Sequence, residues 1–268
     1  MELKDKVVIV TGAGAGIGEG IARVCAREGA SIMVMDRNRE GAQRVASDIV
    51  AQGGKAISFA ADVSRSDEVV AMVAETRKQF GAVDVLVNNA GIIVNAALSL
   101  HEIEETQWDA VMGVNVKGVY LCSKAVLPLM IERKQGKIVN IASISGIRLS
   151  AFGGIDYTTS KAAVLGLTRH LAWEVAPHGI NVNAVCPGLV VTDIVSEAQL
   201  AEVKKLGASS VPLGRTCTTE EIAEGVVFLA GKRSAMVTGQ ELSIDGGSLL
   251  GWGEEVRKVI LARKQAAH

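Results

Sequence analysis

Short runs of apolar, largely β-branched residues alternate along the chain with longer segments in which apolar residues recur every three or four positions. The short runs predict strands buried on both faces, and the longer segments predict amphipathic helices. Strands are expected at Val7–Val10, Ser31–Asp36, Ala56–Ala60, Val83–Val87, Lys137–Ile141, Asn181–Val185 and Glu241–Ile244. Helices are expected at about 16–28, 39–52, 66–80, 104–132, 157–176 and 219–230. This alternation predicts an α/β protein with a doubly wound parallel sheet of about seven strands, helices on both faces and right-handed crossovers.

Two segments break the alternation. Residues 193–213 follow the sixth expected strand without a strand pattern, and a long loop at the carboxyl edge of a parallel sheet is well placed to form a substrate lid. Residues 248–268 extend beyond the last strand with apolar positions spaced for one helical face, which suits a helix docked on its own domain or on a second subunit. Because no linker, repeat or low-complexity tract interrupts the chain, we expect residues 1–268 to form one domain.

Composition narrows the class of protein. The 268 residues are 49% hydrophobic and 21% charged, which suits a large core and argues against disorder. A net charge of -1 gives no electrostatic reason to expect a nucleic-acid or membrane partner. No secretory segment precedes the first strand, and no window of uncharged apolar residues is long enough to predict a membrane span. The cysteines lack metal-ligand spacing, so we expect buried, reduced thiols, no metal and a cytoplasmic location; they are Cys25, Cys122, Cys186 and Cys217.

A glycine-rich loop directly follows the first expected strand. The strict G-x-G-x-x-G fingerprint does not fit it, but Gly-x-x-x-Gly-x-Gly does, with glycines at Gly12, Gly16 and Gly18 and Ile17 inside the loop. Glycines allow a tight turn and close backbone approach, and the following helix offers free N–H groups and a positive dipole end to a pyrophosphate. The alternative is that the segment is only a flexible loop. Its position between a strand and a helix favours a nucleotide site.

The residue that ends the second strand bears on the choice of nucleotide. The Asp36 carboxylate can accept both adenosine-ribose hydroxyls of NAD and would repel the extra phosphate of NADP. The adjacent Arg37 could hold that phosphate, so NADP stays open, and Asp36 could equally cap the next helix. We expect NAD as the cofactor.

A serine, a tyrosine and a lysine carry the candidate chemistry. Tyr157 and Lys161 are spaced i, i+4, so on a helix both side chains reach one pocket. A nearby positive charge lowers the pKa of a tyrosine, and Ser143 can donate a hydrogen bond to the oxygen that gains or loses the proton. Together they could move a proton at a carbonyl or alcohol, although the same spacing is also common for a half-buried aromatic beside a solvated lysine.

In this order, the motifs resemble those of the short-chain dehydrogenase/reductase family over about residues 4–247. Beside the glycine loop and Tyr157-x-x-x-Lys161, the resemblance rests on Asp62-Val63, Asn88-Asn89-Ala90-Gly91, Asn115, Ser143 and the run Pro187–Thr192. It implies a Rossmann-type fold, a nicotinamide cofactor and assembly into homodimers or homotetramers through the helices at 104–132 and 157–176.

The resemblance also implies roles for single residues. Tyr157 would be the general acid/base, Lys161 would lower its pKa and hold the nicotinamide ribose, and Ser143 would orient the substrate oxygen. Asn115 would hold a water in a proton relay to Lys161. The other positions would contact the cofactor: Asp62 and Val63 at the adenine, Asn88 at the adenosine ribose, and Val190 and Thr192 at the nicotinamide.

The substrate is less well defined by the sequence. The residues that flank the expected site are mostly apolar, which predicts a small, largely apolar alcohol, ketone or polyol. Arg148 lies between Ser143 and Tyr157, where it could pair with a carboxylate or phosphate of the substrate or simply be a solvated loop arginine. Two alternatives remain: a cofactor-binding sensor or scaffold without turnover, and a relative that eliminates rather than transfers hydride.

Overall fold

The computed structural model describes residues 1–94, 98–149, 153–191, 209–251 and 258. Its strands form one parallel sheet in the order β3-β2-β1-β4-β5-β6-β7. They are β1 (Val7–Thr11), β2 (Ser31–Asp36), β3 (Lys55–Ala60), β4 (Val85–Asn88), β5 (Gly136–Ile141), β6 (Ile180–Pro187) and β7 (Glu241–Ile244). The chain builds outward from β1 to β3 and then returns to place β4 on the other side of β1. This reversal is a topological switch point, where ligands bind in doubly wound sheets. The predicted fold class is confirmed.

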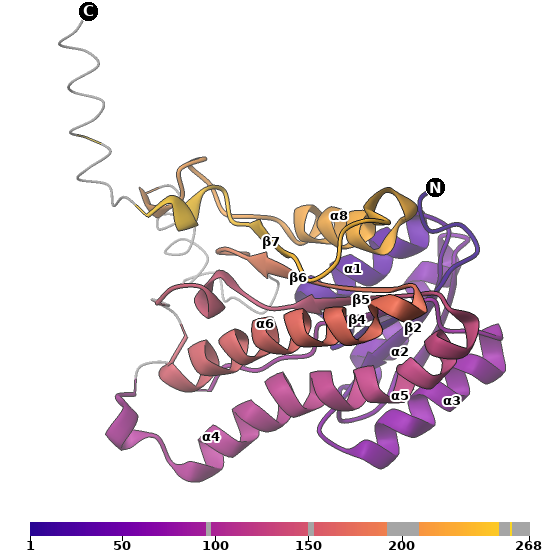
Figure 1. The fold of residues 1–268 in the computed structure, drawn as a ribbon, viewed down its shortest axis with the longest axis horizontal. Coiled ribbons are helices and arrows are strands. Elements are labelled where there is room, and N and C mark those ends of the chain that lie inside the picture. The colour runs from indigo at the N-terminus through magenta and orange to yellow at the C-terminus, as the bar shows by residue number, and fades with distance from the viewer. Residues whose placement is uncertain (95–97, 150–152, 192–208, 252–257, 259–268) are drawn as a thin grey trace, which may run out of the picture.

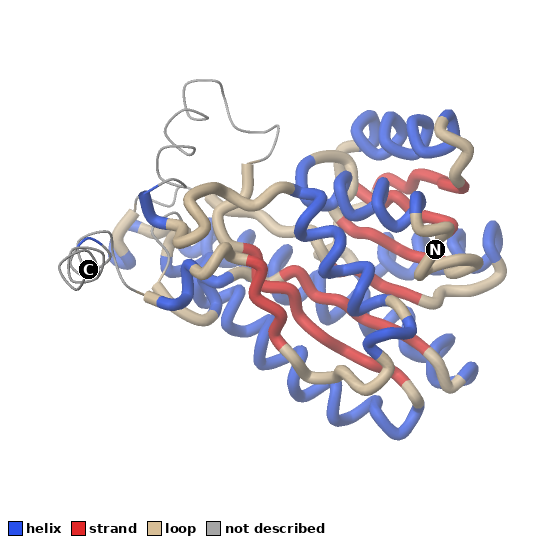
Figure 2. The backbone as a smooth tube through the Cα atoms, turned by 90° about the horizontal axis from the view of Figure 1, so that it is seen from above, coloured by secondary structure: helices blue, strands red, loops and turns tan. Residues whose placement is uncertain are grey.

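Helices cover both faces of the sheet because successive strand residues point to opposite sides. Val8 and Val10 of β1 pack with α1 (Gly16–Arg27), α2 (Arg39–Ala51) and α8 (Thr219–Ala230). Ile9, between them, points to the layer of α3 (Ser66–Phe80), α5 (Gly118–Arg133) and α6 (Ile155–Val175). In Figure 1, α1 and α8 lie above the strands and α5 and α6 below them. Figure 2 shows the strands side by side between these helices.

The expected helix at 104–132 is interrupted. The structure has α4 (Glu105–Met112), a π-helical turn at Gly113–Lys117 and then α5. The extra residue in a π turn rotates the following helix relative to the preceding one, and such turns are common at functional sites. Apolar periodicity alone did not reveal this interruption.

Taken together with the π-helical turn, the helical stretch Glu105–Arg133 is long and apolar enough to cross a membrane by length and composition alone. Core helices of globular proteins meet the same criteria. Here Cys122, Val126 and Met130 of the stretch are fully buried in the layer that covers one sheet face. Packing against the sheet therefore accounts for these three apolar positions.

The segments that follow all seven strands meet at the carboxyl edge of the sheet. A long connection after β6 returns to the edge through Ser210 and Val211, and the segment after β7 ends in a short 3-10 turn at Ser248–Leu250. Most of the expected lid, and most of the extension at 248–268, lie outside the described residues. All four cysteines are free and buried, as predicted.

Candidate active site

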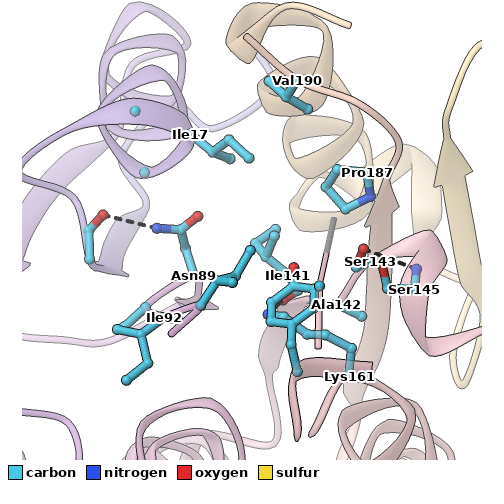
Figure 3. A pocket seen from close by; sticks show the side chains of 18 of the residues that line it. Ile17, Asn89, Ile92, Ile141, Ala142, Ser143, Ser145, Lys161, Pro187 and Val190 are labelled. Atoms are coloured by element: carbon cyan, nitrogen blue, oxygen red, sulfur yellow. Dashed lines mark hydrogen bonds between the residues drawn. The ribbon is translucent and has the colours of Figure 1, made fainter. Parts of the chain in front are cut away.

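A cavity of about 810 Å³ runs along the carboxyl edge of the sheet. Its lining extends from the loops after β2 and β3 to the loops after β6 and β7, and so spans the switch point. Figure 3 shows Ile17, Asn89 and Ile92 facing Ser143, Ser145 and Pro187 across this opening, with Lys161 below them. A cavity that extends across the loops of so many strands suits an extended ligand rather than a compact one.

The glycine loop forms one wall of the cavity. Gly12 and Gly16 have φ values of +63° and +59°, in the left-handed region that favours glycine. A Cβ on Gly18 would lie 2.1 Å from the Gly12 carbonyl oxygen, so no other residue fits there. Helix α1 begins at Gly16, and its N-cap residue Ala15 makes no side-chain capping bond. The first N–H groups of α1 therefore face a cavity in which an anion can bind them. These features fit the pyrophosphate of a dinucleotide.

Charged residues mark the β2–β3 end of the cavity. Asp36 accepts hydrogen bonds from the backbone N–H of Gly14 at 2.9 Å and of Asn38 at 2.8 Å, and so ties the glycine loop to the end of β2. Asp62 also lines this end, where burial opposes ionisation but hydrogen bonds from Ser64 and the charge of Arg37 leave its pKa below the usual value. Val63 lies beside it in the lining.

Asn88 does not reach the cavity. Its Nδ2 donates to Ser123 Oγ at 3.2 Å and to Asn140 Oδ1 at 2.9 Å in the layer beneath the sheet. The neighbouring Asn89 lines the cavity instead, and its amide donates to the carbonyl oxygens of Thr11 and Gly12 at 2.9 Å. The amide of Asn89 thus fixes the glycine loop, a contact that the sequence analysis missed.

Asn115 lies in the π-helical turn and is fully buried. Its side chain accepts from Ile92 N at 2.8 Å and donates to Ile92 O and to Ser160 Oγ, both at 3.0 Å. Ser160, in turn, donates to the carbonyl oxygen of Tyr157 at 2.7 Å. Asn115 therefore connects the loop after β4 to the helix that carries Tyr157. The involvement of Ser160 was not predicted, although it stands next to Lys161 in the sequence.

Ser143 and Tyr157 both line the cavity wall. Burial raises the pKa of Tyr157, and the neighbouring Ser143 hydroxyl offsets only part of that rise. This differs from the expectation that Lys161 lowers the tyrosine pKa. The physical reason is desolvation, which disfavours the phenolate and which helical spacing alone does not reveal.

Lys161 is buried and lines the floor of the cavity. Its ammonium donates to the Ile141 carbonyl oxygen at 2.8 Å and lies 5.6 Å from the centre of the Tyr157 ring. A Cβ on Gly91 would lie 3.4 Å from both Lys161 Nζ and Asn115 Oδ1, so Gly91 leaves open a space that these two polar groups share. Burial lowers the pKa of Lys161 to about 8.

The remaining expected positions divide between described and undescribed residues. Val190 lines the cavity and pairs with Cys217 in an isolated bridge, whereas Thr192 lies outside the described residues. Arg148 lines the cavity and donates to the Ser248 carbonyl oxygen at 2.5 Å. Among the described residues, no group of three or more His, Cys, Asp or Glu side chains is arranged to hold a metal ion.

Comparison with known proteins agrees with this geometry. The model of the family described as enoyl-(acyl carrier protein) reductase matches residues 12–248. The chain belongs to the short-chain dehydrogenase/reductase family. It is therefore an oxidoreductase of a family that binds NAD(P), and the resemblance expected from the motifs is confirmed.

The chain is similar to several characterised members. It is 38% identical over 250 residues to the 3-oxoacyl-[acyl-carrier-protein] reductase FabG of Thermotoga maritima, covering 93% of this chain and 100% of that protein. It is also 38% identical over 250 residues to 2-(S)-hydroxypropyl-CoM dehydrogenase 3 of Xanthobacter autotrophicus, covering 91% of this chain and 97% of that protein.

Solved structures show the same architecture. A short-chain type dehydrogenase/reductase from Mycobacterium marinum superposes with a TM-score of 0.86 at 35% identity, over 92% of this chain and 96% of that one. A 3-oxoacyl-[acyl-carrier protein] reductase from Brucella melitensis with bound NAD superposes with a TM-score of 0.83 at 33% identity, over 92% and 93%.

The lowered pKa of Lys161 predicts a pH-dependent stability difference. The unfolded chain holds the lysine proton up to about pH 10.4, whereas the folded chain loses it near a pKa of about 8, so folding releases protons between these values. Relative to Lys161→Met, the wild-type protein should therefore gain about 2 kcal/mol of unfolding free energy between pH 7 and pH 9.5. Urea denaturation of both proteins at each pH measures this difference. A constant difference would show that the buried lysine titrates normally.

Proposed function

We propose that this protein transfers a hydride between a nicotinamide dinucleotide and the CH–OH or C=O group of a small, largely apolar substrate. The observation that carries the proposal is the convergence of Ser143, Tyr157 and Lys161 on one cavity wall, opposite the glycine loop. The apolar lining beside them, with Ile92, Ile144 and Leu189, supports an alcohol, ketone or polyol with an apolar body. The acyl-carrier reductases among the relatives make a 3-oxoacyl group one candidate within this class.

The protein's own side chains would transfer the proton and orient the substrate oxygen. When bound, the nicotinamide cofactor supplies or accepts the hydride. Tyr157 donates its proton to the carbonyl oxygen during reduction and removes it from the alcohol during oxidation, while Ser143 holds the same oxygen by a hydrogen bond. The Lys161 ammonium stabilises the phenolate that reduction leaves behind. Asn115 and Lys161 border the space kept open by Gly91, where a water could pass the proton onward.

The other proposed cofactor contacts follow the cavity. Gly12, Gly16, Ile17 and Gly18 would hold the pyrophosphate, and Asp62 and Val63 would border the adenine. Asn89 supports the loop at the position where Asn88 was expected to act. Val190 would contact the nicotinamide, and Thr192 is proposed from the family resemblance alone. NAD is the preferred cofactor, because the Asp36 carboxylate stands at the end of β2 and the Arg37 charge acts on Asp62.

A sensor or scaffold without turnover remains the alternative. It is disfavoured by the three buried polar side chains Ser143, Asn115 and Lys161, because a protein that only binds the dinucleotide has no need for the desolvation that these groups undergo. We further propose that the protein acts in the cytoplasm.

Tyr157→Phe should reduce turnover by at least about 1000-fold, because it removes only the hydroxyl that moves the proton. Dinucleotide affinity should stay within a few-fold of wild type. The matched control is Tyr120→Phe, which removes the hydroxyl of the chain's other tyrosine on the outer side of α5. Steady-state assays at the absorbance of the reduced nicotinamide, together with calorimetric NAD titration, provide both measurements. Near-normal turnover in Tyr157→Phe would refute the mechanism.

Asp36→Asn should shift the preference from NAD towards NADP by about 10-fold or more, because it removes a carboxylate that would repel a ribose phosphate. The ratio of kcat/KM for the two cofactors measures the shift. Arg37→Gln serves as the comparison: a fall in NADP use there would assign the phosphate contact to Arg37. If Asp36→Asn leaves the ratio unchanged, the carboxylate does not select the cofactor.

We propose that α5 and α6 form the interface of a homo-oligomer. Ile155 and Trp173 on α6, and Ile131 on α5, are large exposed side chains on elements whose other faces are buried. Trp173 is the most exposed of these side chains, at 78%.

Trp173→Glu should therefore lower the mass measured by size-exclusion chromatography with light scattering, since a buried charge opposes association. Met236→Glu is the matched control, because Met236 is 96% exposed but lies on the loop after α8. An identical mass for wild type and Trp173→Glu would place the interface elsewhere or show a monomer.

A further inference from the structure

Charge is distributed unevenly along the cavity. The β2–β3 end carries Asp36, Arg37 and Asp62. The β5–β7 end carries Arg148 and Lys161, and none of the described residues that line this end is a carboxylate. Among the described lining residues, both charged groups at the end of the cavity that holds Ser143 and Tyr157 are thus cationic. Such a field favours an anionic ligand over a neutral one.

Arg148 is held in a defined position. Its backbone N–H donates to the Ile144 carbonyl oxygen at 3.0 Å, in the turn that follows Ser143. Its Nη1 donates to the Ser248 carbonyl oxygen, in the segment after β7. The guanidinium therefore bridges two loops that are far apart in the sequence. Because a guanidinium has five N–H donors, this single bond leaves a planar edge for a second acceptor.

The contact with Ser248 does not neutralise the charge. Asp245 is the acidic residue of the described segment after β7, and its two oxygens accept from Gly247 N at 2.9 Å and Leu249 N at 2.7 Å. Within the described part of the chain, Arg148 takes part in none of the ion pairs. In contrast, acidic partners hold Arg23, Arg27, Arg44, Arg65, Arg133, Arg169, Arg215 and Arg233.

We propose that Arg148 binds an oxyanion of the substrate, at the end of an apolar chain whose other end carries the reacting carbonyl or alcohol. The substrate class is then an oxo or hydroxy compound with a terminal carboxylate, sulfonate or phosphate. The apolar chain would lie along Ile144 and Leu189, which line the same end of the cavity. This inference rests on the proposed hydride transfer and adds the feature that selects among its substrates.

The experiment uses paired ketones of graded chain length, each with a terminal carboxylate or with its neutral methyl ester. The measured quantity is kcat/KM for the anion divided by kcat/KM for the ester. Wild type should prefer the anion at one or more chain lengths, and Arg148→Gln should lower that ratio by about 10- to 100-fold, as expected for a charge-assisted bidentate contact. Arg148→Lys should retain part of the preference, and a sulfonate series should show the same dependence.

Arg77→Gln is the matched control, because Arg77 is exposed on α3, away from the cavity. Its anion-to-ester ratio should equal that of wild type. A wild type without anion preference would overturn the proposal. So would an equal loss for anion and ester in Arg148→Gln, which would mean that Arg148 only holds the Ser248 segment.

A second measurement separates this proposal from the proposed function. Butane-1-sulfonate is titrated calorimetrically into wild type and Arg148→Gln in the presence of NAD. If no ketone is turned over but sulfonate binding depends on Arg148, hydride transfer fails and the anion site stands. If ketones are turned over but the two proteins bind the sulfonate equally, the anion site fails and hydride transfer stands.

Discussion

The bond from the Lys161 ammonium to the Ile141 carbonyl oxygen is the contact on which the site depends. It joins α6 to the end of β5 and places a charge where water is excluded. A buried ammonium is strongly disfavoured unless acceptors surround it, so the neighbouring backbone must stay in place. Ile141 lies on the sheet, and Asn115 Oδ1 lies across the space that Gly91 leaves open. One buried cation is therefore surrounded by three parts of the structure: the sheet edge, the π-helical turn and the loop after β4.

Much of the fold could be predicted because strand and helix periods differ and the sheet is buried on both faces. The bounds of β2 and β7 were predicted to the residue. The π-helical turn could not be predicted from the sequence. One inserted residue hardly changes the apolar periodicity, which is strong in the helices before and after it. Asn88 was misplaced for a simpler reason: it alternates with Leu86, so its side chain enters the helix layer beside Ser123. The next residue, Asn89, lines the cavity instead.

Motif order predicted that Ser143, Tyr157 and Lys161 lie together, and all three line one cavity. Their roles stay predictions, and their electrostatics could not be read from the sequence. Their protonation depends on burial, which arises from contacts distant in sequence. Asn115, Ser160 and Ile92 illustrate this: three segments contribute one hydrogen-bonded chain that no local pattern encodes.

Burial acts on Tyr157 and Lys161 in opposite directions, and both effects favour their neutral forms. In the free protein the tyrosine therefore keeps its proton and is ready to act as an acid. A phenolate formed during reduction would be stabilised by a charged Lys161, whose ammonium lies 5.6 Å from the centre of the Tyr157 ring. An anion bound at Arg148 would act on this pair as well, because it favours the ammonium. Substrate charge and proton transfer would then be coupled through the field at one end of the cavity.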